Sequence, residues 1–113
     1  MQHGHQLTFY TQQDRTHGHQ PLTEWLLGVA AEVGIVGATV VGGLEGVGHD
    51  GGVHRINLFD LSQQPVQVTM VVTSAQAEAL LARLNQEDTA LFCVQVPALF
   101  GTVGRAAPPT LTV

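Results

Sequence analysis

The sequence contains no lysine, and its cationic side chains are few. Lysine and arginine together number four, all of them arginine, against nine acidic residues, so the formal net charge is −5. Nucleic-acid-binding proteins need a basic surface that neutralises phosphates. The charge balance therefore excludes that class.

Cysteine is also scarce, because Cys93 is the only one. No disulfide bond can form within the chain, and the sequence begins without the pattern of a signal peptide. Both features are typical of a protein that stays in a reducing compartment, and they predict a cytoplasmic location.

The sequence also lacks an uninterrupted apolar segment long enough to span a membrane. Residues 26–44 are almost entirely apolar, but Glu32 and five glycines interrupt them, and no cationic residues flank them. A helix followed by a buried strand explains this segment better. With 113 residues, of which 44% are hydrophobic, the chain predicts one domain spanning residues 1–113, with loose termini at 1–5 and 106–113.

Glycine, in contrast, is concentrated in one place. A β-branched stretch, Ala38–Val41, leads directly into a loop with five glycines between Gly43 and Gly52. Glycine permits positive φ angles and close approach of the backbone to a ligand. The loop is either an ordinary surface connection or a segment that changes shape or wraps a ligand.

The hydrophobic pattern predicts alternating strands and helices along the chain. A helix beginning at Pro21 is expected to end near Gly34, and Thr73 and Gln76 predict a capping box that begins a second helix. We expect strands at residues 6–11, 38–44, 66–72 and 91–96, the last ended by Pro97, and an extended segment at 56–61.

This order predicts an α+β fold of the ferredoxin-like βαββαβ type, with a long glycine-rich loop between the second and third strands. Both helices are expected on one face of an antiparallel sheet. Val71, Phe92, Val94 and Val96 make the other face too apolar to stay in water, which predicts oligomerisation.

Several short motifs occur in an order that is similar to a known family. They are His17-Gly18-His19-Gln20-Pro21-Leu22, then Gly37-Ala38-Thr39-Val40 with Gly43, then Glu45-Gly46-Val47-Gly48, then His54, and finally Asp60-Leu61-Ser62-Gln63-Gln64-Pro65-Val66. Over residues 6–104 the sequence resembles the PII-like signalling proteins, in particular their uncharacterised branch, which is related to classical nitrogen-regulatory PII and CutA-type proteins.

The resemblance implies a homotrimer without enzymatic activity. It implies small effectors, often adenine nucleotides, in clefts between subunits, and a long loop that docks on a membrane transporter or an enzyme. On this basis we expect effector contacts from Gly46, Gly48, His49, His54 and Arg55, with Arg105 as an anion partner.

The sequence departs from the classical PII pattern in two places. Residues 45–57 contain no tyrosine, serine, threonine or lysine. Uridylylation or phosphorylation of the loop, the usual covalent switches of classical PII proteins, therefore has no acceptor side chain. The expected glycine-lysine phosphate loop is replaced by residues 85–89, whose Glu87 and Asp88 disfavour ATP. A less charged effector, such as AMP, ADP or bicarbonate, is easier to accommodate.

The six histidines suggest an alternative, a metal-responsive protein of the same fold. His3 and His5, and likewise His17 and His19, are two residues apart, which places both rings on one face if the segment is a strand. Imidazole binds Zn(II), Cu(II) and Ni(II), and a histidine third from a free amino terminus can complete a square-planar Cu(II) or Ni(II) site. The alternative interpretation is that these histidines are solvent-exposed side chains that bind no metal.

Catalytic motifs are missing. The sequence has no Gly-x-Ser-x-Gly elbow and no His-Glu-x-x-His helix. Cys93 lies within an apolar strand, where burial makes a thiol inert, and Trp25 lies on the apolar stripe of the first predicted helix and is expected in the core.

Overall fold

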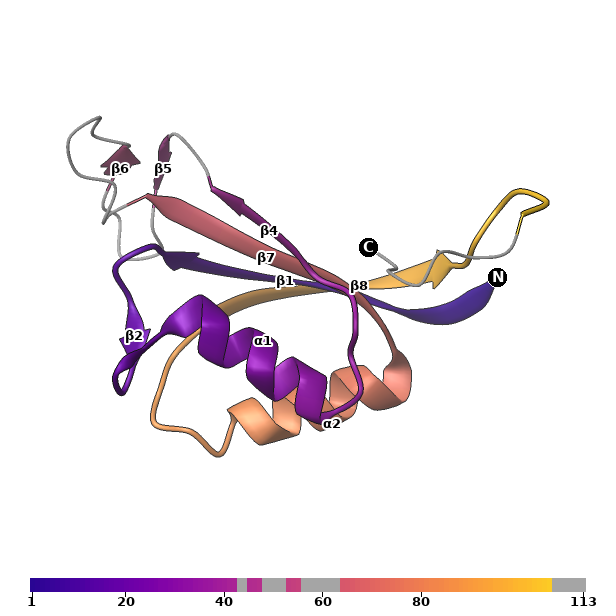
Figure 1. Cartoon of the computed structure of the whole chain (residues 1–113), viewed down its shortest axis with the longest axis horizontal. Helices are drawn as coiled ribbons and strands as arrows, with labels where there is room; N and C mark the ends of the chain where they lie inside the picture. Colours follow the sequence, from indigo (N-terminus) through magenta and orange to yellow (C-terminus); the bar gives the residue numbers. More distant parts are fainter. Residues whose placement is uncertain (43–44, 48–52, 56–63, 107–113) are drawn as a thin grey trace.

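The computed structural model describes residues 1–42, 45–47, 53–55 and 64–106, the two short middle ranges as backbone only. Four strands form an antiparallel sheet in the order β4-β7-β1-β8, and both helices cover one of its faces (Figure 1). The strands of this sheet are β1 (Gln2–Gln12), β4 (Thr39–Gly42), β7 (Pro65–Thr73) and β8 (Phe92–Phe100), and the helices are α1 (Leu22–Glu32) and α2 (Ser74–Leu84).

Two short hairpins complete the described structure. One joins β2 (Thr16–His17) to β3 (Gln20–Pro21), and the other joins β5 (Glu45–Val47) to β6 (Val53–Arg55). With each crossover helix returning to an antiparallel sheet, the element order is that of the ferredoxin-like fold. The predicted fold class is therefore confirmed.

The core lies between the sheet and the helices. Alternate side chains of β7, Val66, Val68, Met70 and Val72, are buried, as the period of two predicts. They meet the buried faces of both helices. The other buried apolar side chains are Leu7, Phe9, Leu22, Leu26, Val29, Ala30, Ile35, Ala77, Leu80 and Leu84.

The helix ends follow the predicted signals. The Thr73 hydroxyl accepts a hydrogen bond from the Gln76 backbone N–H at 3.1 Å, and the Gln76 side-chain oxygen accepts one from the Thr73 N–H at 3.0 Å. Gly34 follows α1 with φ +86°, a left-handed conformation that favours glycine. Pro21 is the N-cap of α1 rather than its first residue.

The strands β1 and β8 are longer than the sequence analysis predicted. β1 begins at Gln2, so residues 2–5 lie in a strand and not in a loose terminus, and β8 continues through Pro97 to Phe100. The two extensions pair with each other, with Gln2 opposite Phe100. Pro97 is tolerated because β8 is an edge strand.

Gly4 is required at its position in β1, because a β-carbon would collide with the Val72 carbonyl and the Phe100 ring.

Other expectations fall outside the described residues. These are the extended segment at 56–61 and residues 107–113 of the loose C-terminus; the strand expected at 38–44 is seen as β4, from Thr39 to Gly42. Among the described residues, no helix combines the length and the apolar character needed to span a membrane.

Candidate functional site

The glycine-rich segment contributes the β5–β6 hairpin at one end of the sheet (Figure 1). The backbone register places Gly46 opposite His54 and Glu45 opposite Arg55. Three of the predicted effector residues, Gly46, His54 and Arg55, are thus brought together by strand pairing. Gly48 and His49 lie outside the described residues.

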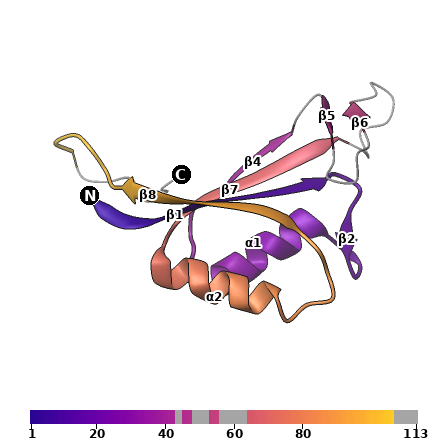
Figure 2. The same ribbon diagram turned by 180° about the vertical axis from the view of Figure 1, so that it is seen from behind.

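Arg105 lies elsewhere. It is exposed in the bend that follows β8, and Figures 1 and 2 both place this segment at the opposite end of the molecule from the β5–β6 hairpin. Of the three arginines whose side chains the structure describes, Arg105 makes no hydrogen bond or ion pair with another described residue. One chain does not bring Arg105 to Arg55, so a site that uses both needs a second subunit.

The sheet face opposite the helices is uncharged over its described strands. The register places Thr8 between Thr69 and Val94 on this face, and the two threonine hydroxyls hydrogen-bond to each other at 3.2 Å. Val71, Phe92, Val94 and Val96 are 45, 49, 39 and 49% exposed, as the sequence predicted. We call this the outer face. Its outward residues are Gln2, Gly4, Gln6, Thr8, Tyr10 and Gln12 of β1, Thr39 and Val41 of β4, Pro65, Gln67, Thr69, Val71 and Thr73 of β7, and Phe92, Val94, Val96, Ala98 and Phe100 of β8.

The loop between α2 and β8, residues 85–91, is held by cationic side chains. Arg83 forms an ion pair with Glu87, and the His17 Nε2 atom lies 3.3 Å from the second oxygen of the same carboxylate. Arg15 donates a hydrogen bond to the Ala90 carbonyl oxygen at 2.8 Å. Two of the four arginines are therefore already bound to this acidic loop.

The pKa of Glu87 is lowered mainly because Arg83 donates a hydrogen bond to its carboxylate, with a further contribution from His17. A carboxyl with a lowered pKa in the folded state stabilises the fold above its unfolded pKa, and this contribution disappears as the pH falls through the folded value.

We therefore expect Glu87→Gln to be less stable than the wild-type protein at pH 7. The difference should shrink as the pH falls below about 4.5, the ordinary value of this group. Denaturant unfolding at a series of pH values measures it. Glu78→Gln, at an exposed position on α2, is the matched control for the loss of one carboxylate charge. A constant difference between pH 3 and pH 7 would contradict the expectation.

Trp25 has two environments. Part of its ring packs against the core, as expected, but the His17 ring stacks on it with centroids 3.9 Å apart and an interplanar angle of 10°. The contacts of His17 with Trp25 and Glu87 link residues far apart in the sequence. No local sequence signal pairs His17 with Glu87, 70 positions away. Only the Arg83–Glu87 spacing of four residues could have been read as a helical ion pair.

The histidines do not form a metal site among the described residues, where no group of three or more histidine, cysteine, aspartate or glutamate side chains converges. His17 is engaged by Trp25 and Glu87, and His19 is exposed in the turn after β2. A square-planar site needs the amide nitrogens of Gln2 and His3 around one ion. Both residues lie in β1, and successive amides of an extended strand point in opposite directions.

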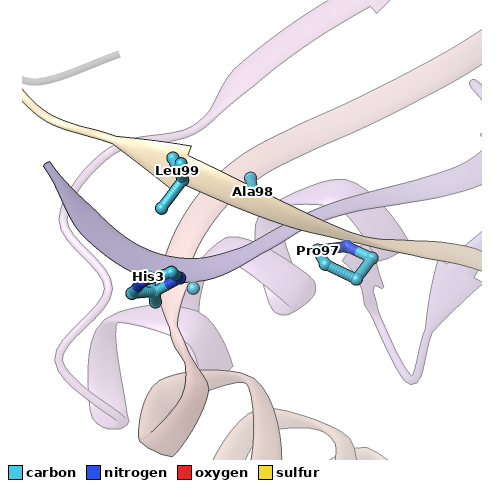
Figure 3. A pocket seen from close by; sticks show the side chains of 5 residues that line it. His3, Pro97, Ala98 and Leu99 are labelled. Atoms are coloured by element: carbon cyan, nitrogen blue, oxygen red, sulfur yellow. The ribbon is translucent and has the colours of Figure 1, made fainter.

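His3 instead lines a hollow of about 380 Å³ together with Gly4, Pro97, Ala98 and Leu99 (Figure 3). The imidazole is the only ionisable side chain in this lining. The hollow therefore lacks the fixed positive charge that an anionic effector requires. His5, on the same strand face, is partly buried.

Cys93 is partly buried on β8, and burial raises the pKa of its thiol. A raised pKa leaves little thiolate at neutral pH, which agrees with the unreactive thiol expected from the sequence.

A family model covers most of the chain. Residues 4–94 match the DUF190 family, whose description is "Uncharacterized ACR". The chain belongs to the DUF190 family. No curated protein matches this member of the family.

Solved structures with the same fold are PII-like proteins. A structure of CPII from Thiomonas intermedia, bound to ADP and bicarbonate, superposes with a TM-score of 0.64 at 19% identity, covering 88% of this chain and 90% of that one. A PII-like signalling protein from Thermus thermophilus gives 0.63 at 18% identity, covering 87% and 91%. CPII bound to ADP, AMP and acetate gives 0.59 at 16%, covering 89% and 91%. The predicted PII-like relationship is thus confirmed at the level of fold.

Proposed function

We propose that this DUF190 protein is a non-enzymatic PII-like regulatory protein that forms a homotrimer. A small effector, an adenine nucleotide or a bicarbonate-like anion, binds in clefts between subunits and sets the conformation of the 45–57 loop, which docks on a transporter or an enzyme. The observation that carries the proposal is the fold shared over 88% of the chain with CPII, a protein bound to ADP and bicarbonate.

The effector site combines two subunits in this proposal. Gly46, His54 and Arg55 come from the hairpin of one subunit, with Gly48 and His49 in the same loop. Arg105 comes from a neighbour, because the bend after β8 lies at the far end of its own chain (Figures 1 and 2). An exposed guanidinium without a partner is suited to pairing with an anion.

Self-association is supported by the outer face. Its apolar side chains are exposed in the single chain, and exposed apolar patches of this kind mark interaction sites. Each copy carries a net charge of −5. Contact between like-charged copies is least unfavourable where neither surface is charged, and the outer face meets that condition.

The α2–β8 loop favours an effector of low charge. It carries Glu87 and Asp88, and its nearest cations, Arg83 and Arg15, already bind Glu87 and the Ala90 carbonyl. These groups offer little to a triphosphate. We therefore expect ADP, AMP or bicarbonate to bind more tightly than ATP.

Thermal unfolding of untagged protein tests the proposal with ADP, AMP, ATP and bicarbonate as separate ligands. A ligand at 100 times its dissociation constant adds about 2.7 kcal/mol to the free energy of unfolding and raises the melting temperature clearly. We expect a rise with ADP, AMP or bicarbonate that exceeds the rise with ATP. The absence of any rise would contradict effector binding, and a larger rise with ATP would contradict the charge argument.

A further inference from the structure

Residues 13–21, which contain the β2–β3 hairpin, form a compact strap beside α1 (Figure 1). The strap is closed at its base, where the Leu22 N–H donates to the Arg15 carbonyl oxygen at 2.9 Å and the Arg15 N–H donates to the Gln12 carbonyl at 3.2 Å. Thr16 pairs with Pro21 across the hairpin. These bonds position the backbone of Arg15 and His17 relative to β1 and α1.

The strap is fastened to the α2–β8 loop by side chains. Arg15 binds the Ala90 carbonyl at 2.8 Å, and His17 lies between the Trp25 ring and the Glu87 carboxylate. Two attachment points three residues apart in the loop limit its movement more than one would. The loop is thereby tied to α1 as well as to the end of α2.

This attachment lies next to the edge strand β8. Ala90 precedes Phe92, the first residue of β8, by two positions, and β8 has a sheet neighbour, β1, on one side only. Phe92 lies on the outer face and packs edge-on against Tyr10 with ring centroids 5.8 Å apart. The contact from Arg15 to Ala90 therefore adds an attachment directly before the strand, whose register is already set by its pairing with β1.

We propose that Arg15 and His17 are positioning residues for self-association of this chain through the outer face. The partner is a second copy, because the face carries no charged side chain in its described strands while each chain has a net charge of −5. The strap anchors the loop that leads into β8, the strand at the edge of that face. The proposal rests on the proposed homotrimer and adds the residues that make assembly depend on the strap.

Sedimentation velocity over a range of protein concentrations tests the proposal with four variants. We expect Arg15→Ala to raise the dissociation constant of the assembly about tenfold. Arg15→Lys should stay close to wild type, because an ammonium group can still donate to the Ala90 carbonyl. His17→Phe keeps a ring on Trp25 but loses the Glu87 contact, and should weaken assembly less than Arg15→Ala. His19→Ala, at the exposed turn of the same hairpin, is the matched control and should leave the constant unchanged.

Circular dichroism of the dissociated chains separates positioning from folding, since Arg15→Ala should keep the wild-type spectrum. Equal assembly of Arg15→Ala, His17→Phe and the wild-type protein would overturn the role of the strap while leaving the homotrimer intact. Weakening by His19→Ala to the same extent would also overturn it. A wild-type protein that is monomeric at every concentration would overturn the proposed homotrimer, and this proposal with it.

Discussion

Val94→Asp is expected to convert the protein into a monomer. Val94 lies near the middle of the outer face, opposite Thr8, and is 39% exposed in the single chain. In an assembly built on this face the new carboxylate would be buried without a cation, because the described outward residues carry none. An uncompensated buried charge costs about 3–5 kcal/mol, which weakens association by more than about 100-fold. Light scattering coupled to size exclusion measures the mass.

Gln95→Asp is the matched control for this prediction. It adds the same charge at the next residue of β8, whose side chain lies on the other side of the sheet, in line with Leu7, and is exposed. We expect Gln95→Asp to keep the assembled mass of the wild-type protein. Retention of that mass by Val94→Asp would show that the outer face is not the contact surface, and dissociation by both variants would show an effect of net charge alone.

The fold was predictable because local patterns carried its main determinants. Val66, Val68, Met70 and Val72 alternate so regularly that the strand and its buried face follow from the period alone. The Thr73–Gln76 capping box and Gly34 marked helix ends that the structure confirms. The predicted order is strand, helix, strand, strand, helix, strand, and few topologies are compatible with it.

The ends of β1 and β8 were not predictable in the same way. Pro97 was interpreted as the end of a strand because proline cannot donate to a ladder, but this limit is weaker on an edge strand. Residues 2–5 contain two histidines and one glycine and have no hydrophobic alternation. Their strand structure comes from pairing with residues 97–100, a contact between the two ends of the chain that no local signal shows.

The candidate site was predictable only in part, and for related reasons. The strand pairing that brings Gly46 to His54 follows from one glycine-rich hairpin. The bend after β8, which contains Arg105, lies at the other end of the molecule, so the role of Arg105 depends on how copies associate. The contacts of Arg15 and His17 with the α2–β8 loop join residues 75 and 70 positions apart and have no counterpart in spacing or composition.

Arg55→Ala is expected to weaken binding of the anionic effector by about 1.5–3 kcal/mol, or about 10- to 150-fold. This is the loss for a hydrogen bond to a charged group. The sequence contains four arginines and no lysine, and two of the arginines already bind the α2–β8 loop. Of the other two arginines, Arg55 lies on the hairpin beside Gly46 and His54, and it is the one proposed to contact the effector. Isothermal titration calorimetry with ADP, and separately with bicarbonate, measures the affinity.

Two further variants distinguish a direct contact from a general charge effect. Arg55→Lys keeps the positive charge but loses the planar fork of donors, so we expect an intermediate affinity. Arg83→Gln removes the same charge from α2, where Arg83 is partly buried and paired with Glu87, and we expect it to weaken binding less than Arg55→Ala, because it leaves the hairpin intact. Equal losses in Arg55→Ala and Arg83→Gln would mean that net charge, and not contact, controls binding. An unchanged affinity in Arg55→Ala would remove Arg55 from the site and leave Arg105 of the neighbouring subunit as the remaining candidate for the anion.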